Sequence, residues 1–345
     1  MSNTSKGWGR KGSKFWMQMV ACFPTLEKEF IKEVEKAEYG KETNTTKLTW
    51  ISPCIDKDLE EYTLNSPTMK EVLGFKEEFW NTWKGTNLPF WPARQPQWDG
   101  IAFCAETKTL YLIEAKAHLS ETNTSISINN EENPSESYNI RVNSLRYARK
   151  SFWKGSDVPS KETLWWGGSL VKKESNQKEF YYQIGNRLAF LRFLNEKKDE
   201  LGVEIRDVKL IFLNFADDYT LGKDKYGHDL SATICNWEEH YEKIWKAVTG
   251  RDSAPDNVFV INYNVGTILG SSRIEKEEHL VKKENKAGSK RLYRWEDANP
   301  AHWFKYRNGS KEVLFDFLYE DKKMRCCKRG TNIPIKEIET ILGVN

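Results

Sequence analysis

The clearest indication of the fold is the stretch QWDGIAFC at residues 97–104. A second stretch, TLYLIEAK at 109–116, follows it after four residues. Both runs are rich in residues that favour strands, and the segment 105–108 between them is compatible with a turn. This arrangement predicts a β-hairpin. Nearly every position of both runs is apolar, so we expect strands that are covered on both faces.

The register of this hairpin brings three ionisable residues together. If the turn is 105–108, residue 104 faces residue 109, and counting outward places Asp99 opposite Glu114. Directly opposed residues lie about 4.5–5.5 Å apart at Cβ. Lys116 lies two residues after Glu114 and so shares its face of the strand. We therefore expect Asp99, Glu114 and Lys116 to open into one cleft that solvent can reach.

This trio has the composition of a metal-dependent hydrolase site. The carboxylates of Asp99 and Glu114, with the backbone carbonyl of Ala115, are hard oxygen ligands that suit Mg²⁺ or Mn²⁺. A metal-bound water is acidified and becomes a nucleophile near neutral pH. Lys116 would hold that water and neutralise charge on a phosphate. The alternative is a salt bridge between Lys116 and either carboxylate, with a structural role only.

Outward from the hairpin, helical and strand patterns alternate. Before it we expect helices and a strand, and after it a polar loop, three helices and two strands. The ranges are helices 24–38, 69–83, 140–153, 179–201 and 236–250, strands 48–52, 207–216 and 257–265, and the loop 119–139. This order predicts the α/β class, with a mixed central sheet flanked by helices.

The composition changes after residue 270, where the chain becomes dense in lysine and arginine. We therefore divide it into a domain at 1–270, with a core at about 70–265, and a small basic α+β module at 271–345. Within that module we expect a strand or hairpin at 313–327 and a short helix at 334–343. A basic run can bind phosphates, so substrate binding is the role considered for this module.

Composition and charge exclude several classes of protein. The 345 residues carry a formal net charge of only +3, so no overall basic excess marks a nucleic-acid binder. No stretch approaches about 18 consecutive apolar residues, so we expect no membrane helix. The first residues lack the apolar segment of a secretory signal. The six cysteines form no CxxC pair, which favours a reducing compartment and a cytoplasmic location over a zinc ribbon.

Three stretches resemble a known nuclease superfamily. They are WPARQPQWDGIAF at 91–103, LIEAKAHLSE at 112–121 and FYYQIGNRLAFLRFL at 180–194. Together they resemble a bacterial branch of the PD-(D/E)XK superfamily, with the restriction-endonuclease-like fold. The resemblance implies that Asp99 and Glu114 bind Mg²⁺ or Mn²⁺ and that Lys116 assists the attacking water. Trp98 stands where this superfamily usually has proline.

The same resemblance implies further site residues. Many members add an acidic residue from an N-terminal helix, and here that residue would be Glu78 or Glu77, for which a solvated helix face is the alternative. Related branches often carry a glutamine near the metal on the helix after the hairpin, which corresponds to Gln183. Arg187 lies one helical turn further and would grip a phosphate oxygen. The alternative for both is simple packing of the helix on the sheet.

Two residues beside the motif complete the predicted nucleic-acid surface. Arg94 would meet a backbone phosphate and Trp98 would stack on a base, although tryptophan in an α/β protein is more often part of the core. The function that we expect is a metal-dependent nuclease that cuts DNA rather than RNA. The alternative is a non-catalytic nucleic-acid-binding or structural module that keeps the fold. A homodimer is compatible with either.

Overall fold

The computed structural model describes most of residues 12–265 and, beyond them, only the backbone of five strands. Between residues 12 and 265 it leaves out 23, 55–56, 58, 82–88, 127–133, 156–161, 168–178, 219–220, 222–225 and 227–228.

The described part of the chain contains six α-helices and four short 3-10 helices. The helices are α1 (Gly12–Cys22), α2 (Pro24–Tyr39), α3 (Pro67–Leu73), α4 (Glu136–Phe152), α7 (Tyr182–Lys197) and α8 (Ile234–Val248). The 3-10 helices are η2 (Glu77–Trp80), η3 (Leu119–Thr122), η4 (Thr163–Trp165) and η5 (Lys198–Glu200).

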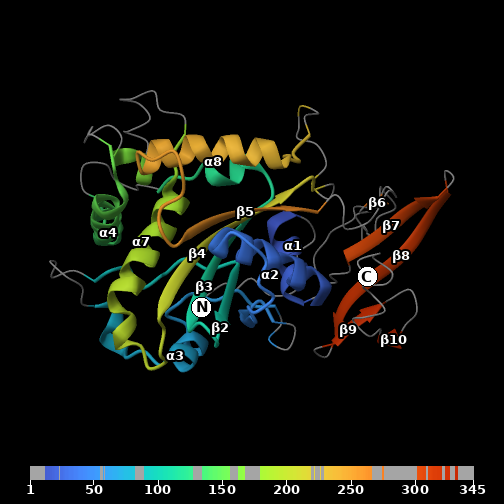
Figure 1. The fold of residues 1–345 in the computed structure, drawn as a ribbon, viewed down its shortest axis with the longest axis horizontal. Coiled ribbons are helices and arrows are strands. Elements are labelled where there is room, and N and C mark those ends of the chain that lie inside the picture. Colours follow the sequence, from blue (N-terminus) through green and yellow to red (C-terminus); the bar gives the residue numbers. More distant parts are fainter. Residues whose placement is uncertain are drawn as a thin grey trace, which may run out of the picture.

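The first sheet is mixed and has five strands in sequence order (Figure 1). The strands are β1 (Thr49–Ser52), β2 (Gly100–Cys104), β3 (Thr109–Lys116), β4 (Asp207–Ala216) and β5 (Val258–Asn264). β1, β2 and β3 pair in antiparallel fashion, whereas β3, β4 and β5 are parallel. Helices connect the parallel strands, as such pairs require. The predicted α/β class and the mixed central sheet flanked by helices are confirmed.

The hairpin has the predicted register. Cys104 pairs with Thr109, and the ladder runs outward to Gly100 opposite Ile113. Every residue of β3 is buried, as expected for a strand covered on both faces. One further step along the same register places Asp99, just before β2, across from Glu114.

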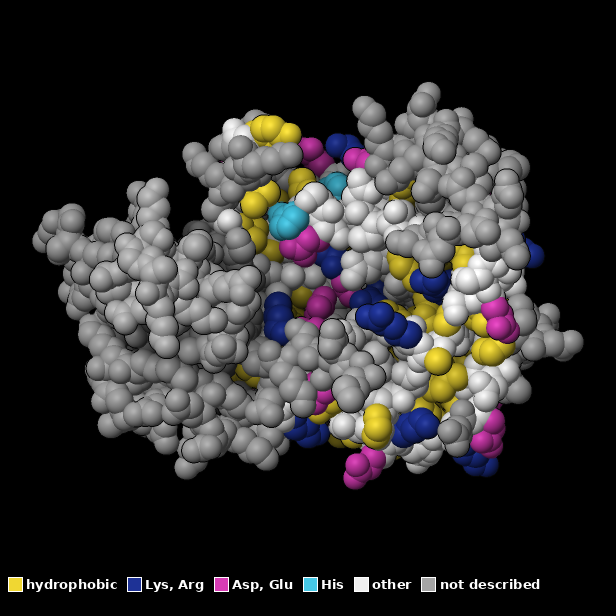
Figure 2. Space-filling view, turned by 180° about the vertical axis from the view of Figure 1, so that it is seen from behind, with side chains coloured by type: hydrophobic (Ala, Val, Ile, Leu, Met, Phe, Trp, Pro, Cys, Tyr) yellow, Lys and Arg dark blue, Asp and Glu magenta, His cyan; other side chains and the backbone are white. Residues whose placement is uncertain are grey.

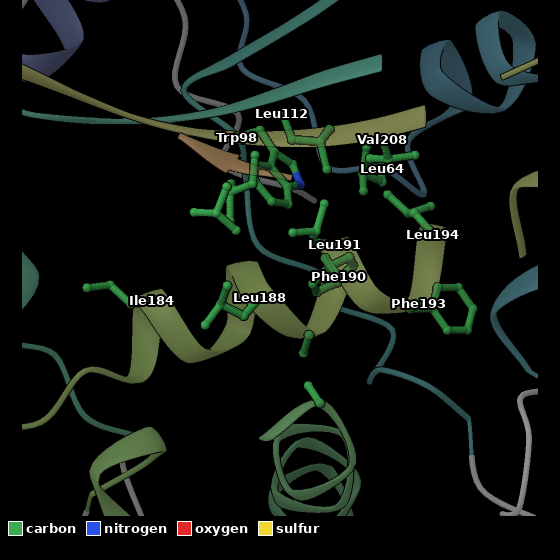
Figure 3. Close-up of a cluster of buried hydrophobic side chains, with 14 of the residues drawn as sticks. Leu64, Trp98, Leu112, Ile184, Leu188, Phe190, Leu191, Phe193, Leu194 and Val208 are labelled. Atoms are coloured by element: carbon green, nitrogen blue, oxygen red, sulfur yellow. The ribbon is translucent and has the colours of Figure 1, made fainter. Parts of the chain in front are cut away.

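Two apolar clusters cover the two faces of this sheet. On one face, α1 and α2 pack over Tyr111, Ile113 and Leu213. On the other face, α7 and α8 pack over Leu112 and Phe212. Figure 3 shows α7 beneath the strands, with Leu191 rising from the helix toward them. Glu114 and Lys116 have the parity of Leu112 and therefore lie on the α7 face.

The predicted helix at 69–83 is wrong. α3 ends at Leu73 because Gly74 adopts a left-handed conformation with φ 64° and donates its N–H to Lys70 O. The apolar residues Phe75 and Phe79 follow in a separate segment that includes η2. Trp83, the last apolar position of that pattern, lies outside the described residues.

Two other helices begin earlier than the sequence pattern predicts. α4 starts at Glu136, and α8 at Ile234. For α8 the cap is Thr233, whose Oγ1 accepts a hydrogen bond from Asn236 N, while the Asn236 Oδ1 accepts one from the Thr233 backbone N–H. Asn236, the first residue of the predicted 236–250 helix, is thus the second half of a capping box.

The second sheet is antiparallel, with the order β10-β9-β8-β7-β6. Its strands are β6 (Ile274–Glu275), β7 (Ala301–Arg307), β8 (Ser310–Glu320), β9 (Lys323–Cys326) and β10 (Thr331–Asn332). β8 and β9 form the hairpin expected at 313–327. The expected helix at 334–343 and the basic run lie outside the described residues, and the boundary near 270 stays a prediction.

Among the helices within the described ranges, none combines the length and apolar character that crossing a bilayer requires.

Candidate active site

Glu114 is the centre of the candidate site and accepts hydrogen bonds from three side chains. Its Oε1 accepts from Lys116 Nζ and from Gln183 Nε2. Its Oε2 accepts from Arg187 Nε at 2.6 Å, and the second guanidinium nitrogen, Nη2, pairs with the same oxygen. The side chain of Glu114 is 1% exposed, so these partners replace the water that a carboxylate normally binds.

Asp99 lies across the hairpin from Glu114 and is anchored differently. Its Oδ2 accepts a hydrogen bond from the backbone N–H of Ala115 at 2.8 Å. This bond holds one carboxylate oxygen against β3, between the positions of Glu114 and Lys116. Asp99 is only partly buried, whereas Glu114 and Lys116 are almost fully buried. The predicted trio therefore comes together on one face, as the register indicated.

The first two turns of α7 supply the other contacts. Gln183 and Arg187 are one turn apart and both reach Glu114. The N–H of Gln183 donates to Thr124 Oγ1 at 2.8 Å, which fixes the start of the helix. Arg187 also donates from Nη2 to Gln97 O at 2.7 Å, beside the predicted metal ligands. Both glutamine and arginine thus lie at the site, as the resemblance implied.

Two residues of the predicted nucleic-acid surface are buried instead of exposed. The Trp98 ring is fully buried and lies under the guanidinium of Arg187, whose Cζ is 4.3 Å from the ring centroid. Arg187 itself is 3% exposed. Trp98 therefore offers no open face to a base, and Arg187 neutralises Glu114 rather than a phosphate. Arg94 is exposed, as a phosphate contact requires.

A further acidic residue beside Asp99 is Glu61, which the sequence analysis did not name. Thr63 bridges Gln97 in antiparallel fashion, and Trp98 N donates to Tyr62 O at 3.0 Å. Continuing this register places Glu61 beside Asp99, on the side away from Glu114. Lys14 Nζ lies 3.7 Å from Glu61 Oε1. An isolated β-bridge joins only one residue pair and leaves no periodic pattern in the sequence. The position of Glu61 therefore could not be found from sequence patterns.

Glu78 does not take this role. It is exposed on η2, and η2 packs at the far end of α7, where Phe79 meets Phe193 with ring centroids 5.4 Å apart. Phe193 lies ten residues beyond Gln183, which is about 15 Å along a helix. The structure therefore does not bring Glu78 to the carboxylates around Glu114. The side chain of Glu77 lies outside the described residues.

The electrostatics of the site are dominated by three neighbouring carboxylates. Burial, and then the negative charges of Glu114 and Glu61, raise the pKa of Asp99 to about 8. Burial also raises the pKa of Glu61, and Glu114 adds to the effect. Burial opposes ionisation of Glu114, but Arg187 and Lys116 outweigh it and lower the pKa of this residue. One carboxylate is therefore held as an anion while its neighbour retains a proton near neutrality.

Lys116 remains a cation in this environment. Burial disfavours its charge, but the carboxylates of Glu114 and Asp99 outweigh the burial and raise the pKa of Lys116 above its usual value. A lysine with a raised pKa cannot act as a general base near neutral pH. It can donate hydrogen bonds and stabilise negative charge.

Access to the site is narrower than the predicted open cleft. Figure 2 shows acidic, basic and histidine side chains gathered in a hollow of this face of the molecule. The carboxylate of the partly exposed Glu121 lies 3.1 Å from His118 Nε2. Burial raises the pKa of Glu121, and the nearby positive charge of Lys116 opposes that rise. Glu114 and Lys116 lie beneath the surface, and of the trio only Asp99 reaches solvent. A substrate could thus meet Asp99 directly and Lys116 only after local opening.

The donor atoms fit a hard divalent cation in chemistry but are not gathered around one point. Glu61, Asp99 and Glu114 are neighbouring oxygen donors, and the pKa of Asp99 is raised first by burial and then by the negative charge of Glu114 and Glu61, which a divalent cation would offset. Within the described ranges, however, no three histidine, cysteine or acidic side chains converge closely enough to hold a metal. Glu114 would have to exchange at least one of its present partners. The carbonyl of Ala115 stays a predicted ligand.

Searches of this chain against protein-family models, curated proteins and solved structures give no match, so the superfamily resemblance rests on the sequence motifs alone.

Proposed function

We propose that the protein is a metal-dependent nuclease that hydrolyses phosphodiester bonds, in DNA rather than RNA, on a restriction-endonuclease-like fold. The observation that carries the proposal is the convergence of Asp99, Glu114 and Lys116 on one face of the hairpin, with Gln183 of α7 on the same carboxylate. These residues come from three separate segments, the residue before β2, the strand β3 and the helix α7. A salt bridge with a structural role alone needs only two residues of β3, Glu114 and Lys116.

Asp99 and Glu114, with the carbonyl of Ala115, would hold Mg²⁺ or Mn²⁺. The bound ion would acidify a water molecule and stabilise the charge that develops on the phosphate. Glu61 adds negative charge beside Asp99 and favours a divalent cation over a monovalent one. The N–H of Ala115 keeps Asp99 directed toward β3.

The remaining residues of the site would position the carboxylate of Glu114 and neutralise negative charge. Lys116 stays protonated, so it donates hydrogen bonds to the attacking water or to a phosphate oxygen as negative charge grows there. Gln183 fixes one oxygen of Glu114 through a neutral donor. Arg187 fixes the other oxygen and also joins it to the backbone at Gln97. These contacts hold the carboxylate in one orientation before any substrate arrives.

The test is cleavage of supercoiled plasmid and of single-stranded RNA by the purified protein. We expect nicking of DNA with Mg²⁺ or Mn²⁺, little turnover with Ca²⁺, whose looser coordination positions water poorly, and none with chelator. Lys116→Ala should lower the cleavage rate by about 10²-fold or more. The matched control is Lys108→Ala, which alters an exposed lysine at the turn of the same hairpin. It should cleave at the wild-type rate.

Cleavage that survives chelation would refute the metal-dependent mechanism. Equal rates for Lys116→Ala and the wild type, with circular dichroism unchanged, would remove the catalytic role from this face of the hairpin. Cleavage of RNA alone would correct the substrate and leave the site assignment in place.

One observation favours a second candidate, a non-catalytic module. Both carboxylate oxygens of Glu114 already have partners within the protein. Lys116 and Arg187 are buried with it, as in a structural ion network. A module of this kind would bind nucleic acid or a partner without cleavage. Retention of DNA on the protein with no product in any divalent metal would support it.

A further inference from the structure

Asn214 of β4 is the neighbour of Lys116 at the carboxyl ends of the parallel strands. The register of β3 and β4 pairs Lys116 with Asn214, and the register of β4 and β5 pairs Asn214 with Asn262. Paired residues of neighbouring strands lie on the same face of the sheet, and the strands are about 4.8 Å apart. Asn214 therefore stands beside Lys116, on the side of β3 away from Asp99.

The side chain of Asn214 is fully buried, and only one end of its amide has a partner. Its Nδ2 donates to Asn262 Oδ1 at 2.9 Å, which directs the amide nitrogen toward β5. Within the described part of the chain, no group donates to its Oδ1. A buried acceptor without a donor costs free energy. A donor that reached this oxygen in another conformation would recover that free energy.

Tyr241 of α8 shows that Asn214 and Glu114 lie close to a common point. Its ring packs on Phe212 of β4 with centroids 5.7 Å apart. Burial raises the pKa of the Tyr241 hydroxyl, the charge of Glu114 adds to the rise, and the side chain of Asn214 opposes it. Both side chains therefore act on one neutral hydroxyl. The ammonium of Lys116 is bonded to the same Glu114 carboxylate.

We propose that Asn214 Oδ1 is a second acceptor for the Lys116 ammonium, to which Lys116 turns when Glu114 binds a divalent cation. This inference rests on the metal-dependent function proposed above. An ammonium has three N–H donors, and the bond to Glu114 uses one of them. The flexible stem of a lysine can redirect these donors. Asn214 is thus a positioning residue, because it acts on the reaction through Lys116.

The second acceptor removes an obstacle to cation binding at Glu114. This carboxylate has to give up at least one present partner, and two of its partners are themselves cations. Arg187 is also held by Gln97 O at 2.7 Å, so Lys116 is the cation that moves. A buried charge left without a partner is strongly destabilising. Asn214 Oδ1 gives the displaced ammonium a neutral partner and keeps it beside the reacting centre.

The test is the affinity of the full chain for Mn²⁺, measured by titration calorimetry, together with the Tm in chelator. Asn214→Val removes the acceptor and places a residue that suits a buried strand. We expect Mn²⁺ to bind about ten-fold more weakly, as loss of a hydrogen bond to a charged group implies. The Tm in chelator should equal or exceed that of the wild type. A lower Tm with unchanged Mn²⁺ affinity would overturn the proposal and leave Asn214 a structural role.

Two further variants test whether the effect passes through Lys116. In the background of Lys116→Met, Asn214→Val should cause no additional loss of Mn²⁺ affinity, because the ammonium that it serves is gone. Tyr241→Phe removes the other hydroxyl donor near Asn214 and should keep the affinity within about two-fold of the wild type. An additional ten-fold loss in the Lys116→Met background, or an equal loss in Tyr241→Phe, would overturn the proposal.

A crystal structure with Mn²⁺ tests the exchange in the wild type, without any variant. Lys116 Nζ should lie within about 3.2 Å of Asn214 Oδ1. An ammonium still bonded to Glu114 beside the bound ion would overturn the exchange.

The failure of this proposal and the failure of the nuclease assignment have different signatures. Plasmid cleavage with unchanged Mn²⁺ affinity in Asn214→Val would overturn the role of Asn214 alone. Weakened Mn²⁺ binding in that variant, with no cleavage of DNA or RNA by the wild type, would support the role of Asn214 and refute the nuclease. No Mn²⁺ binding by the wild type would overturn both.

Discussion

Two buried glutamates of this protein, Glu35 on α2 and Glu114 on β3, have similar burial but different partners. Glu35 accepts from the N–H groups of Thr43, Asn44, Thr45 and Thr46 and from the Thr43 hydroxyl, all between 2.6 and 3.0 Å. The donors are neutral and lie within eleven residues of it. Glu114 accepts only from side chains, two of which are charged, and two come from about 70 residues away.

Under the proposed function, the difference separates a structural carboxylate, Glu35, from a carboxylate that would take part in chemistry, Glu114. Hydrogen bonds, chiefly from the Thr43 hydroxyl and the loop amides, overcome burial and lower the pKa of Glu35. Its partners belong to the loop that it orders and cannot leave without unfolding it. The partners of Glu114 are side chains of β3 and α7, so they do not belong to a loop that this carboxylate orders. Its neighbour Asp99 has a pKa raised to about 8 by burial and by the nearby carboxylates.

The largest effect that tests this comparison is on activity. Asp99→Asn should lower DNA cleavage by about 10²-fold or more, because it removes a ligand and a charge from the reacting centre. Glu35→Gln should leave kcat within about two-fold of the wild type. Rates of plasmid nicking in Mg²⁺ measure both. A similar loss in the two variants would mean that the two sites do not differ in function.

A somewhat smaller effect is expected on stability at the other glutamate. Glu35→Ala leaves the loop amides with water as their only partner and should lower the free energy of unfolding by about 2–3 kcal/mol in urea denaturation. Because the pKa of Glu35 is lowered, its contribution is present above its ordinary pKa of 4.5 and is lost as the pH falls further.

The control for this loss is Glu33→Ala, which removes an exposed carboxylate of α2 paired with Lys36. It should change the free energy of unfolding by less than about 0.5 kcal/mol. An equal loss in the two variants would contradict a specific role for the bonds that Glu35 makes to the loop.

The smallest effect concerns the pH dependence of Asp99. Its pKa rises from 3.8 to about 8 on folding, so the folded protein binds the proton more tightly than the unfolded chain does. Stability in chelator should therefore fall as the pH rises through this window. Asp99→Asn removes the titration, and its Tm should exceed that of the wild type by about 2–4 °C at pH 8, with a narrower gap at pH 5. A gap that widens toward pH 5 would reverse the assigned sign.

The hairpin and its register were predictable from the sequence because strand pairing has a fixed period. Four residues between two apolar runs left one arrangement that places Cys104 opposite Thr109, and the positions of Asp99, Glu114 and Lys116 follow from it. Gln183 and Arg187 were predictable as a pair because they are one helical turn apart. The strand 207–216 matches β4 residue for residue.

The features that the sequence did not predict share a physical cause. Each depends on contacts between residues far apart in the chain, and such contacts leave no periodic pattern in the sequence. The 69–83 helix failed at Gly74, whose Cα lies so close to Gly202 that a Cβ would stand 2.8 Å from the Gly202 Cα. Glu61 reaches the site through a bridge of single residues. The burial of Trp98 depends on α7, some ninety residues later in the chain. No local pattern reports such long-range packing.

The sequential order of the first sheet has a consequence for how the protein is made. Each of β1 to β5 neighbours the next strand in the sequence, so the sheet can grow at one edge while the chain leaves the ribosome. β4 is the longest of these strands and, apart from its first residue, is entirely buried. Until β5 arrives, β4 presents an unpaired apolar edge of the kind that draws other chains into aggregates. During synthesis, β4 therefore has an unpaired edge from residue 216 until the residues of β5 have been added.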